Sequence, residues 1–320
     1  MGVGAVVSLA AIEVVLPTYN GVLYLEAQIG SIYHQTLRPQ RVLLRDDGSS
    51  DGTQALISQL QQRYGDWLQV LPADVNLGCV ANVNRLLETT KAPYVALSDQ
   101  DDLWLPQKLQ LSLNRLQQLE QQHGADTPLL VHSDLELVDQ DGIPLGCSYL
   151  KRQRLDPLRT APLDLAVTNV VTGCTVLLNR ALLDKALPIP PQALMHDWWL
   201  ALVTSVFGRI ELLPQSTVLY RQHGHNVLGA QGLGLLYWCR RLRRFMAEPA
   251  AAGTLVNAVV QVQTFENRYN RFVTELPALL RLPRRVRWFL FFQLPVNRRL
   301  RKHGPLRSIA MVGLLLILPR

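Results

Sequence analysis

Residues 94–102 read Tyr-Val-Ala-Leu-Ser-Asp-Gln-Asp-Asp, a short apolar run that leads straight into three carboxylates. The apolar part predicts a buried strand, and the carboxylates follow at its carboxyl end. Neighbouring like charges raise one another's pKa, so this cluster is expensive unless a cation neutralises it. Oxygen ligands favour Mg²⁺ or Mn²⁺ over zinc, and these ions commonly keep positions for phosphate oxygens. The stretch therefore predicts a metal-bound diphosphate; the alternative is a polar turn in which Asp102 caps a helix starting near Pro106.

Strand-like and helix-like patterns alternate along the first 132 residues. Short apolar strands are predicted at 13–16, 41–45, 67–71, 94–98 and 129–132. Apolar residues at helical spacing occupy the intervals between them. This alternation with short connections predicts an α/β fold with a doubly wound, mostly parallel sheet. Open sheets of this kind bind ligands at the carboxyl ends of their strands.

A second acidic stretch also follows a predicted strand end. Residues 45–53 read Arg-Asp-Asp-Gly-Ser-Ser-Asp-Gly-Thr. The carboxylate of Asp47 suits the N3–H donor edge of uracil or thymine. The same residues are typical of a turn, and Asp51 is a candidate helix cap. Acidic clusters at two separate strand ends favour the nucleotide interpretation.

Composition indicates a globular protein in a reducing compartment. Apolar residues make up 48% of the chain and charged residues 18%. The four cysteines form no CxxC pair, which argues against a zinc site or a disulfide framework. The N-terminus lacks the basic region of a signal peptide.

Charge divides the chain into two parts. Residues 1–225 carry 16 Lys/Arg against 22 Asp/Glu, whereas residues 226–320 carry 16 against 3. We therefore predict one domain over 10–225 and a basic, helical C-terminal region over 226–320.

The basic C-terminal region interleaves arginines with bulky apolar residues, as in 238–245 (WCRRLRRF) and 284–292 (RRVRWFLFF). This composition suits an anionic membrane surface, so peripheral membrane association is predicted in preference to nucleic acid binding. The last apolar run, 309–318, is too short to span a bilayer as a helix. The alternative is a basic helical tail that packs on the body of the protein.

Five stretches belong together: 16–20 (LPTYN), 45–53 (RDDGSSDGT), 98–102 (SDQDD), 195–199 (MHDWW) and 220–226 (YRQHGHN). In this order and spacing they resemble the family-2 inverting glycosyltransferases, which have the nucleotide-sugar-binding fold called GT-A. The resemblance covers about residues 10–230. The Asp-Gln-Asp-Asp form, with 169–175 (NVVTGCT) and the late Tyr-Arg-Gln-His, is closest to bacterial rhamnosyltransferase-like members.

For the donor, the resemblance implies a nucleotide-sugar site at the first three stretches. Pro17 and Tyr19 would contact the nucleotide, with Tyr19 at its base. Asp47 would accept hydrogen bonds from the imide N–H of the base, and Asp46 would support that loop. Asp99 would lie near the ribose or the diphosphate.

For the metal, the resemblance implies that Asp101 ligates Mg²⁺ or Mn²⁺ and that His223 is a further ligand of the metal or of the diphosphate. Arg221 would hold the departing diphosphate, on which charge builds as the sugar bond breaks.

For the acceptor, the resemblance implies that Asp197 is the catalytic base. An inverting displacement needs one base to take the proton of the attacking hydroxyl. Burial against the neighbouring indoles would raise the pKa of Asp197 and make it a better base. The alternative role is a helix cap. Gly173, Cys174 and Trp198 would lie on the acceptor side.

The predicted function is metal-dependent inverting transfer of a sugar, rhamnose among the candidates. The donor would be a dTDP- or UDP-type sugar nucleotide, and the acceptor a cell-envelope or lipid-linked glycan. The enzyme would work in the cytoplasm, at the inner face of the cell membrane. The alternatives are a sugar nucleotidyltransferase and a non-catalytic, membrane-docked nucleotide-sugar-binding protein. Residues 146–166 have no clear period and predict a loop over the site.

Overall fold

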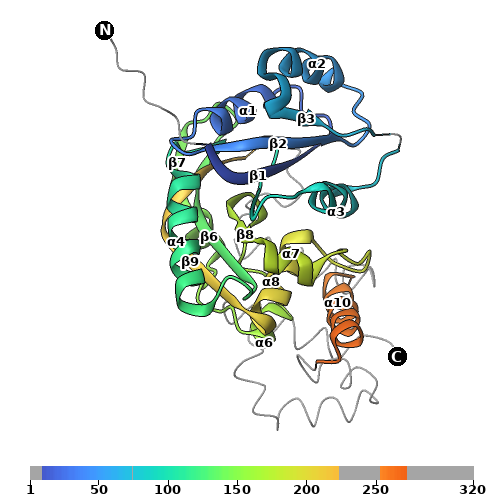
Figure 1. Ribbon diagram of the computed structural model, residues 1–320, viewed down its shortest axis with the longest axis vertical. Helices are drawn as coiled ribbons and strands as arrows, with labels where there is room; N and C mark the ends of the chain where they lie inside the picture. The colour runs from blue at the N-terminus through green and yellow to red at the C-terminus, as the bar shows by residue number, and fades with distance from the viewer. Residues whose placement is uncertain (1–8, 74, 223–252, 272–320) are drawn as a thin grey trace, which may run out of the picture.

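The computed structural model describes residues 9–73, 75–222 and 253–271. Its centre is a nine-stranded sheet in the order β3-β2-β1-β4-β8-β6-β9-β5, with β7 paired to β6 beside that path. Helices pack on both faces of the sheet (Figure 1). The predicted α/β fold is confirmed.

The first half of the sheet is the predicted strand–helix alternation. Its strands are β1 (Leu9–Thr18), β2 (Arg38–Asp46), β3 (Leu68–Val70) and β4 (Tyr94–Leu97), and their pairings are all parallel. The connecting helices are α1 (Leu25–Tyr33), α2 (Thr53–Tyr64) and α3 (Cys79–Thr89). Because β1 lies between β2 and β4, the two acidic stretches leave the sheet at the same edge, on either side of β1.

The second half of the sheet is mixed. The short strand β8 (Leu177–Asn179) runs antiparallel to β4 and to β6 (Leu129–Val138), and β6 runs parallel to β9 (Arg209–Arg221). The remaining elements here are β5 (Leu103–Trp104), α4 (Lys108–His123), β7 (Pro144–Ser148), α7 (Arg180–Ala186) and α8 (His196–Phe207). Strands β5 and β8 have only two and three residues, which is too short to show the apolar pattern from which a strand is predicted.

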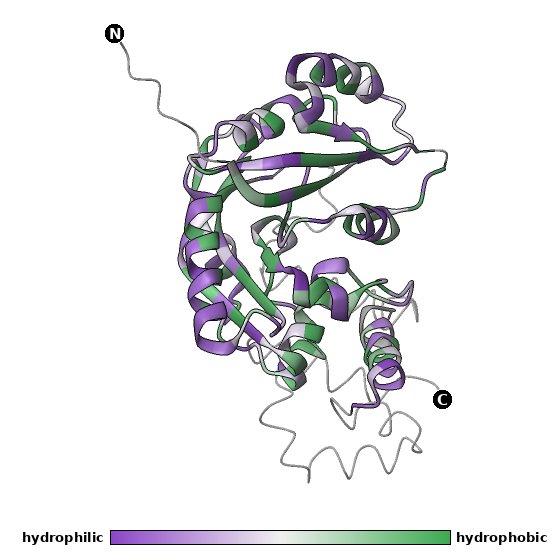
Figure 2. Ribbon diagram, in the orientation of Figure 1, coloured by the Kyte–Doolittle hydropathy of each residue, from purple (hydrophilic) through white to green (hydrophobic). Residues whose placement is uncertain are grey.

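Two apolar cores lie on opposite faces of the sheet. Along β1, Val14 and Leu16 enter the core beneath α1, α2 and α4, whereas Val15 enters the core beneath α3, α7 and α8. Burial on both faces explains why the central strands read as continuous apolar runs. Figure 2 shows polar residues along the outer faces of α2 and α4.

One expectation about local structure is wrong, and one alternative is excluded. Residues 146–166 are not a featureless loop, because they contain most of β7, then α5 (Tyr149–Gln153) and α6 (Pro162–Leu165). These elements are too short to show a period. Asp102 does not cap α4, whose N-cap is Gln107; its Oδ1 instead accepts from the backbone N–H of Arg221 at 3.3 Å.

The structure describes one segment of the basic C-terminal region, helix α10 (Gly253–Tyr269), which lies on the side of the sheet that carries α7 and α8 (Figure 1). Residues 223–252 and 272–320 lie outside the described residues, and with them His223 and both arginine-rich stretches. Among the described residues, no helix combines the length and apolar character needed to cross a bilayer.

Candidate active site

A cavity of about 660 Å³ opens at the carboxyl ends of β1, β2 and β4. Most of the residues predicted for the site line it: Pro17, Tyr19, Asp47, Asp99, Asp101, Gly173, Asp197 and Trp198. Asp46, Cys174 and Arg221 do not line it. The fold therefore brings residues of all five motif stretches to one place, with Tyr220 lining the cavity for the fifth, and the first three stretches meet there as the strand-end argument predicted.

On the nucleotide side, Asp47 is held in a fixed orientation. Its Oδ1 accepts from Nη1 of Arg45 and from the backbone N–H of Leu77, each at 2.8 Å. Its Oδ2 accepts from the backbone N–H of Gly78 at 2.8 Å. The ion pair with Arg45 is buried, so neither side chain is free to swing into solvent. Asp47 thus presents a preorganised carboxylate edge to the cavity.

Gln100 joins the ends of β1 and β4, a role that the sequence did not reveal. Its Oε1 accepts from Oγ1 of Thr18 at 2.5 Å and from the backbone N–H of Tyr19 at 2.9 Å. Its Nε2 donates to the carbonyl of Tyr19 at 3.0 Å. The amide group therefore orders the Tyr19 backbone, which leaves the Tyr19 ring half-exposed beside the cavity.

Asp46 and Arg221 lie off the cavity and hold loops, a role that the resemblance implied for Asp46 but not for Arg221. Asp46 is buried and accepts from the backbone N–H of Ser49 at 3.0 Å, which closes the turn after β2. Arg221 is also buried, and its Nε donates to the carbonyl of Asp101 at 3.1 Å while Nη1 donates to that of Gln140 at 2.6 Å. The guanidinium of Arg221, which was expected to bind a diphosphate, therefore donates hydrogen bonds to backbone carbonyls.

The acidic loop after β4 has more negative charge than its surroundings compensate. Burial and the charges of Asp101 and Asp197 raise the pKa of Asp99 to about 7. Burial and the charges of Asp99 and Asp101 raise the pKa of Asp102 well above its usual value. Oδ2 of Asp102 is buried and has no hydrogen-bond partner within the described part of the chain. These features fit a divalent cation, which would lower the cost of holding the carboxylates together.

The group of candidate ligand atoms that the structure brings together is not the expected pair of Asp101 and His223. Ligand atoms of Asp99, Asp102 and Cys174 lie within 4.8 Å of one another. Cys174 was expected on the acceptor side, but it is fully buried beneath the acidic loop. Burial and the charges of Asp102 and Asp99 raise the pKa of its thiol, so the neutral form is favoured. The hard ligands of this group are the oxygens of Asp99 and Asp102; Asp101 is not part of it, and His223 lies outside the described residues.

Lys108, at the start of α4, is buried completely near this cluster. Its Nζ donates to the carbonyl of Thr175 at 3.2 Å and lies 4.3 Å from the centre of the Trp104 ring. Burial lowers its pKa to about 8, against the charges of Cys174 and Asp102, which favour the charged form. In the sequence, one signal pointed to this positive charge near the acidic loop: Lys108 falls on the apolar face of a predicted helix.

Asp197 lies in the first turn of α8 and faces the cavity. Its Oδ2 accepts from the backbone N–H of Gly173 at 2.9 Å, whereas Oδ1 is buried and has no partner among the described residues. Burial raises the pKa of Asp197, although His196 and the backbone N–H groups of Gly173 and Trp198 oppose the shift. Its side chain does not cap α8, whose N-cap is Met195. Oδ1 is therefore the carboxylate oxygen with unused capacity to accept a hydrogen bond from the described residues.

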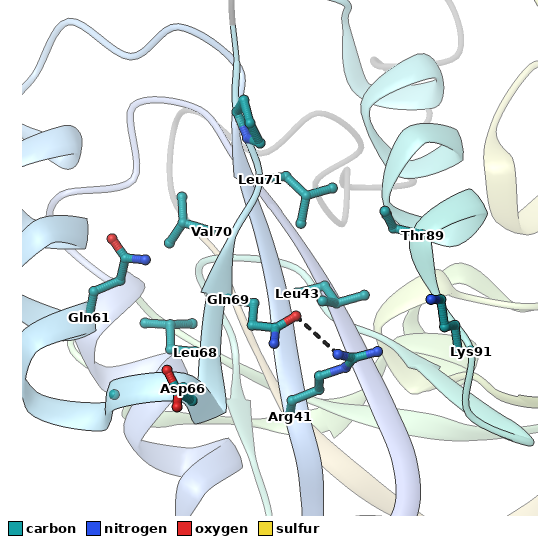
Figure 3. A pocket seen from close by; sticks show the side chains of 12 residues that line it. Arg41, Leu43, Gln61, Asp66, Leu68, Gln69, Val70, Leu71, Thr89 and Lys91 are labelled. Carbon is teal, nitrogen blue, oxygen red and sulfur yellow. Dashed lines mark hydrogen bonds between the residues drawn. The ribbon is translucent and has the colours of Figure 1, made fainter.

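A second hollow, of about 680 Å³, lies beside the edge strand β3 (Figure 3). Arg41, Gln69 and Lys91 line it, and Arg41 donates to Gln69 at 3.1 Å. Its lining includes a single carboxylate, that of Asp66, and shares no residue with the first cavity. The clustered carboxylates assign the chemistry to the first cavity.

Residues 13–184, more than half of the chain, match the family described as Glycosyl transferase family 2. The chain belongs to this family. The match includes the nucleotide-side loop and the acidic loop of this family 2 chain, and it ends before Asp197.

Two curated proteins illustrate how this family 2 chain relates to others. An uncharacterized protein of Mycobacterium tuberculosis is 28% identical over 217 residues, which are 67% of this chain and 60% of that protein. An uncharacterized glycosyltransferase of Nostoc sp. is 27% identical over 225 residues, or 67% of this chain and 66% of that protein. The chain thus spans less than two thirds of the length of either relative.

Solved structures share the fold at low sequence identity. The mannosyltransferase PcManGT from Pyrobaculum calidifontis, in complex with GDP-Man and Mn²⁺, has a TM-score of 0.52 and 17% identity, covering 96% of this chain and 85% of that one. S. aureus TarS 1-349 in complex with UDP has a TM-score of 0.51 and 16% identity, covering 94% and 89%. The family 2 chain therefore has the fold of these two structures.

Proposed function

We propose that this chain is a metal-dependent inverting glycosyltransferase that moves a sugar from a nucleotide diphosphate sugar to a hydroxyl group. The observation that carries the proposal is that Asp47, Asp99 and Asp197 line one cavity, although 150 positions of sequence separate the first from the last. Membership of the glycosyl transferase family 2 supports the reaction class.

The nucleotide is proposed to bind between the ends of β1 and β2. Asp47 has both oxygens engaged, yet a carboxylate accepts about four hydrogen bonds and Oδ2 receives only one from the residues described. That capacity suits an imide N–H donor, as in a UDP- or dTDP-type donor. The half-exposed ring of Tyr19 supplies a stacking surface at the same end of the cavity.

Mg²⁺ or Mn²⁺ is proposed to bind at the acidic loop, held by Asp99 and Asp101 on the cavity side, with Asp102 behind them. His223 is proposed as a further ligand on the strength of the motif alone. When bound, such a cation neutralises charge on the departing diphosphate. Arg221, through the carbonyl of Asp101, holds the loop in the shape that this requires.

In the proposed reaction, the acceptor hydroxyl attacks the anomeric carbon from the face opposite the diphosphate. Oδ1 of Asp197 takes the hydroxyl proton as the new C–O bond forms, and the bond to the diphosphate oxygen breaks with its electron pair. The product is an inverted glycoside and a nucleoside diphosphate. The raised pKa of Asp197 makes its carboxylate a stronger base than an exposed one.

The acceptor is proposed to be a cell-envelope or lipid-linked glycan, reached at the cytoplasmic face of the membrane. The excess of 16 Lys/Arg over 3 Asp/Glu in residues 226–320 supports this, because such a region is attracted to anionic lipid. Rhamnose is proposed as the sugar because the Asp-Gln-Asp-Asp form resembles rhamnosyltransferases.

A panel of UDP-, dTDP- and GDP-sugars tests the proposal, with thermal unfolding followed with and without Mn²⁺ or Mg²⁺. We expect one nucleotide class to raise the unfolding midpoint, and only with metal. A ligand at 100 times its Kd stabilises by about 2.7 kcal/mol, which is readily measured. Assay of the protecting sugar then separates the alternatives, since a nucleotidyltransferase forms pyrophosphate and a binding protein forms no product. Failure of every sugar nucleotide to protect would contradict the proposal.

Gly173→Ala is expected to lower turnover by about tenfold, because a misplaced base loses rate steeply. A Cβ at this position would lie 3.0 Å from Nε2 of His196 and 3.4 Å from Oδ2 of Asp197, which forces the base to shift. The measurement is kcat with the protecting sugar. Gly30→Ala is the matched control, since its Cβ would meet nothing within 4 Å inside α1. Equal turnover in the two variants would show that Gly173 does not place the base.

A further inference from the structure

Helix α10 lies beyond the family match, yet it packs into the core behind the proposed base. Val262 and Phe265 are fully buried, and Phe265 belongs to the apolar core beneath α3, α7 and α8. Figure 1 shows α10 (orange) beside α7, at the opposite end of the molecule from α2. The family match stops at residue 184, so nothing in that match assigns α10 a role.

A buried amide of α10 holds the segment immediately before Asp197. Gln261 has no exposed surface, and its Oε1 accepts from the backbone N–H of Leu194 at 2.9 Å. Leu194 precedes Met195, the N-cap of α8, and Asp197 is in the first turn of that helix. Gln261 therefore restrains the backbone three residues ahead of the proposed base.

Aromatic rings of α10 hold the residues immediately after Asp197. The ring of Phe265 lies 5.9 Å from that of Trp199, centre to centre, and the ring of Tyr269 stacks on Trp199 at 6.2 Å. Nε1 of Trp199 donates to the carbonyl of Ala186 at 3.0 Å. The helix thus contacts the chain on both sides of Asp197.

The far end of α10 is attached to the loop that precedes α8. The guanidinium of Arg268 donates to the carbonyls of Leu187 and Pro188, the latter at 2.6 Å. The hydroxyl of Tyr269 donates to the carbonyl of Lys185 at 2.7 Å. Helix α10 is therefore attached at several points to the segments around the start of α8.

We propose that α10 positions Asp197 and that Gln261 is the positioning residue through which it acts; this inference rests on the proposed function. Oδ2 of Asp197 accepts from the backbone N–H of Gly173, and Asp197 itself lies in the first turn of α8, so its aim depends on where the backbone of α8 begins. Catalytic groups must be held within about 0.5 Å of their productive position. A buried hydrogen bond to Leu194 supplies such a restraint.

The test compares three variants of the full chain. Gln261→Met keeps the length of the side chain and removes the acceptor. Gln261→Glu keeps an accepting oxygen and removes Nε2, which has no partner among the described residues. Gln263→Met makes the same substitution on a half-buried glutamine two residues along α10 and serves as the matched control. The readouts are hydrogen exchange of the backbone amides of residues 190–199 and steady-state kinetics.

We expect Gln261→Met to speed exchange of the 190–199 amides by about fivefold, the effect of one lost hydrogen bond. We expect kcat to fall by about tenfold or more while KM for the donor stays within about twofold, because the donor loops are on β1, β2 and β4. Gln261→Glu should restore both exchange and kcat toward the wild-type values. Gln263→Met should change neither.

Three outcomes would each overturn the inference. The first is equal exchange of the 190–199 amides in Gln261→Met and Gln263→Met. The second is faster exchange in Gln261→Met without a fall in kcat. The third is a fall in kcat matched by an equal rise in donor KM. A wild-type chain that turns over no sugar nucleotide would refute the proposed function instead, and the exchange comparison would still decide whether Gln261 holds this segment.

Discussion

Asp197→Asn is expected to lower kcat by about 10²–10⁴-fold, the range that general-base catalysis contributes. Asparagine has the same shape and can still accept the hydrogen bond from the backbone N–H of Gly173, so the fold around it should persist. It cannot take the proton of the acceptor hydroxyl. Turnover should therefore fall while metal-dependent protection by the sugar nucleotide remains. The measurements are kcat and the unfolding midpoint with and without donor.

The control for this prediction is Asp184→Asn, which removes an exposed carboxylate from α7. It should leave both kcat and donor protection at wild-type values. Undiminished turnover in Asp197→Asn would remove the proposed base from the mechanism. Loss of donor protection together with turnover would instead indicate a ligand-binding role for Asp197.

Asp99→Asn is expected to have opposite effects on stability and on activity. Without metal, the variant should be more stable than wild type near neutral pH, because one of several crowded carboxylates has lost its charge. With Mn²⁺ it should gain little stability, and kcat should fall by about 10³-fold, since a catalytic cation contributes several kcal/mol. Unfolding midpoints in chelator and in Mn²⁺, together with kcat, measure both effects.

The direction of the stability change in Asp99→Asn without metal follows from how the free energy of unfolding depends on pH. The pKa of Asp99 is raised from 3.8 to about 7, so between these values the folded chain binds more protons than the unfolded chain. Its free energy of unfolding in chelator should therefore fall as pH rises from about 4 to about 7, and Asp99→Asn should remove part of this slope. Asp126→Asn, an exposed carboxylate far from any cluster described, is the control. A variant that still binds Mn²⁺ and turns over normally would exclude Asp99 as a ligand.

Much of the site was predictable because its residues sit at the ends of strands with clear apolar patterns. Asp47 and Asp99 follow β2 and β4, and parallel pairing with β1 brings those ends together. Asp197 was predictable only from a motif, since α8 reaches the cavity through contacts that no local pattern specifies. Its place on the cavity wall agrees with that prediction, while its role stays a prediction.

Roles inside the site were less predictable than positions. An arginine at the end of a strand near a diphosphate site looks like an anion ligand, yet Arg221 donates to the carbonyl of Asp101 in the acidic loop and to that of Gln140 between β6 and β7. Cys174 follows a glycine on the cavity wall, yet its side chain points into the core, against Asp102. The direction of the Cys174 side chain depends on the short turn after Thr172. A turn of this length has no repeating pattern from which the sequence could predict that direction.

By itself the sequence determined the α/β alternation, the two acidic strand ends and the basic C-terminal region, because apolar periodicity, turn residues and charge are local properties of the chain. Only the tertiary structure decided that β8 enters the sheet antiparallel, that Lys108 and Cys174 are buried beside the acidic loop, and that α10 supports the start of α8. These features depend on which surfaces meet. Contacts between residues tens of positions apart are chosen by the packing of the whole core rather than by any stretch of the sequence.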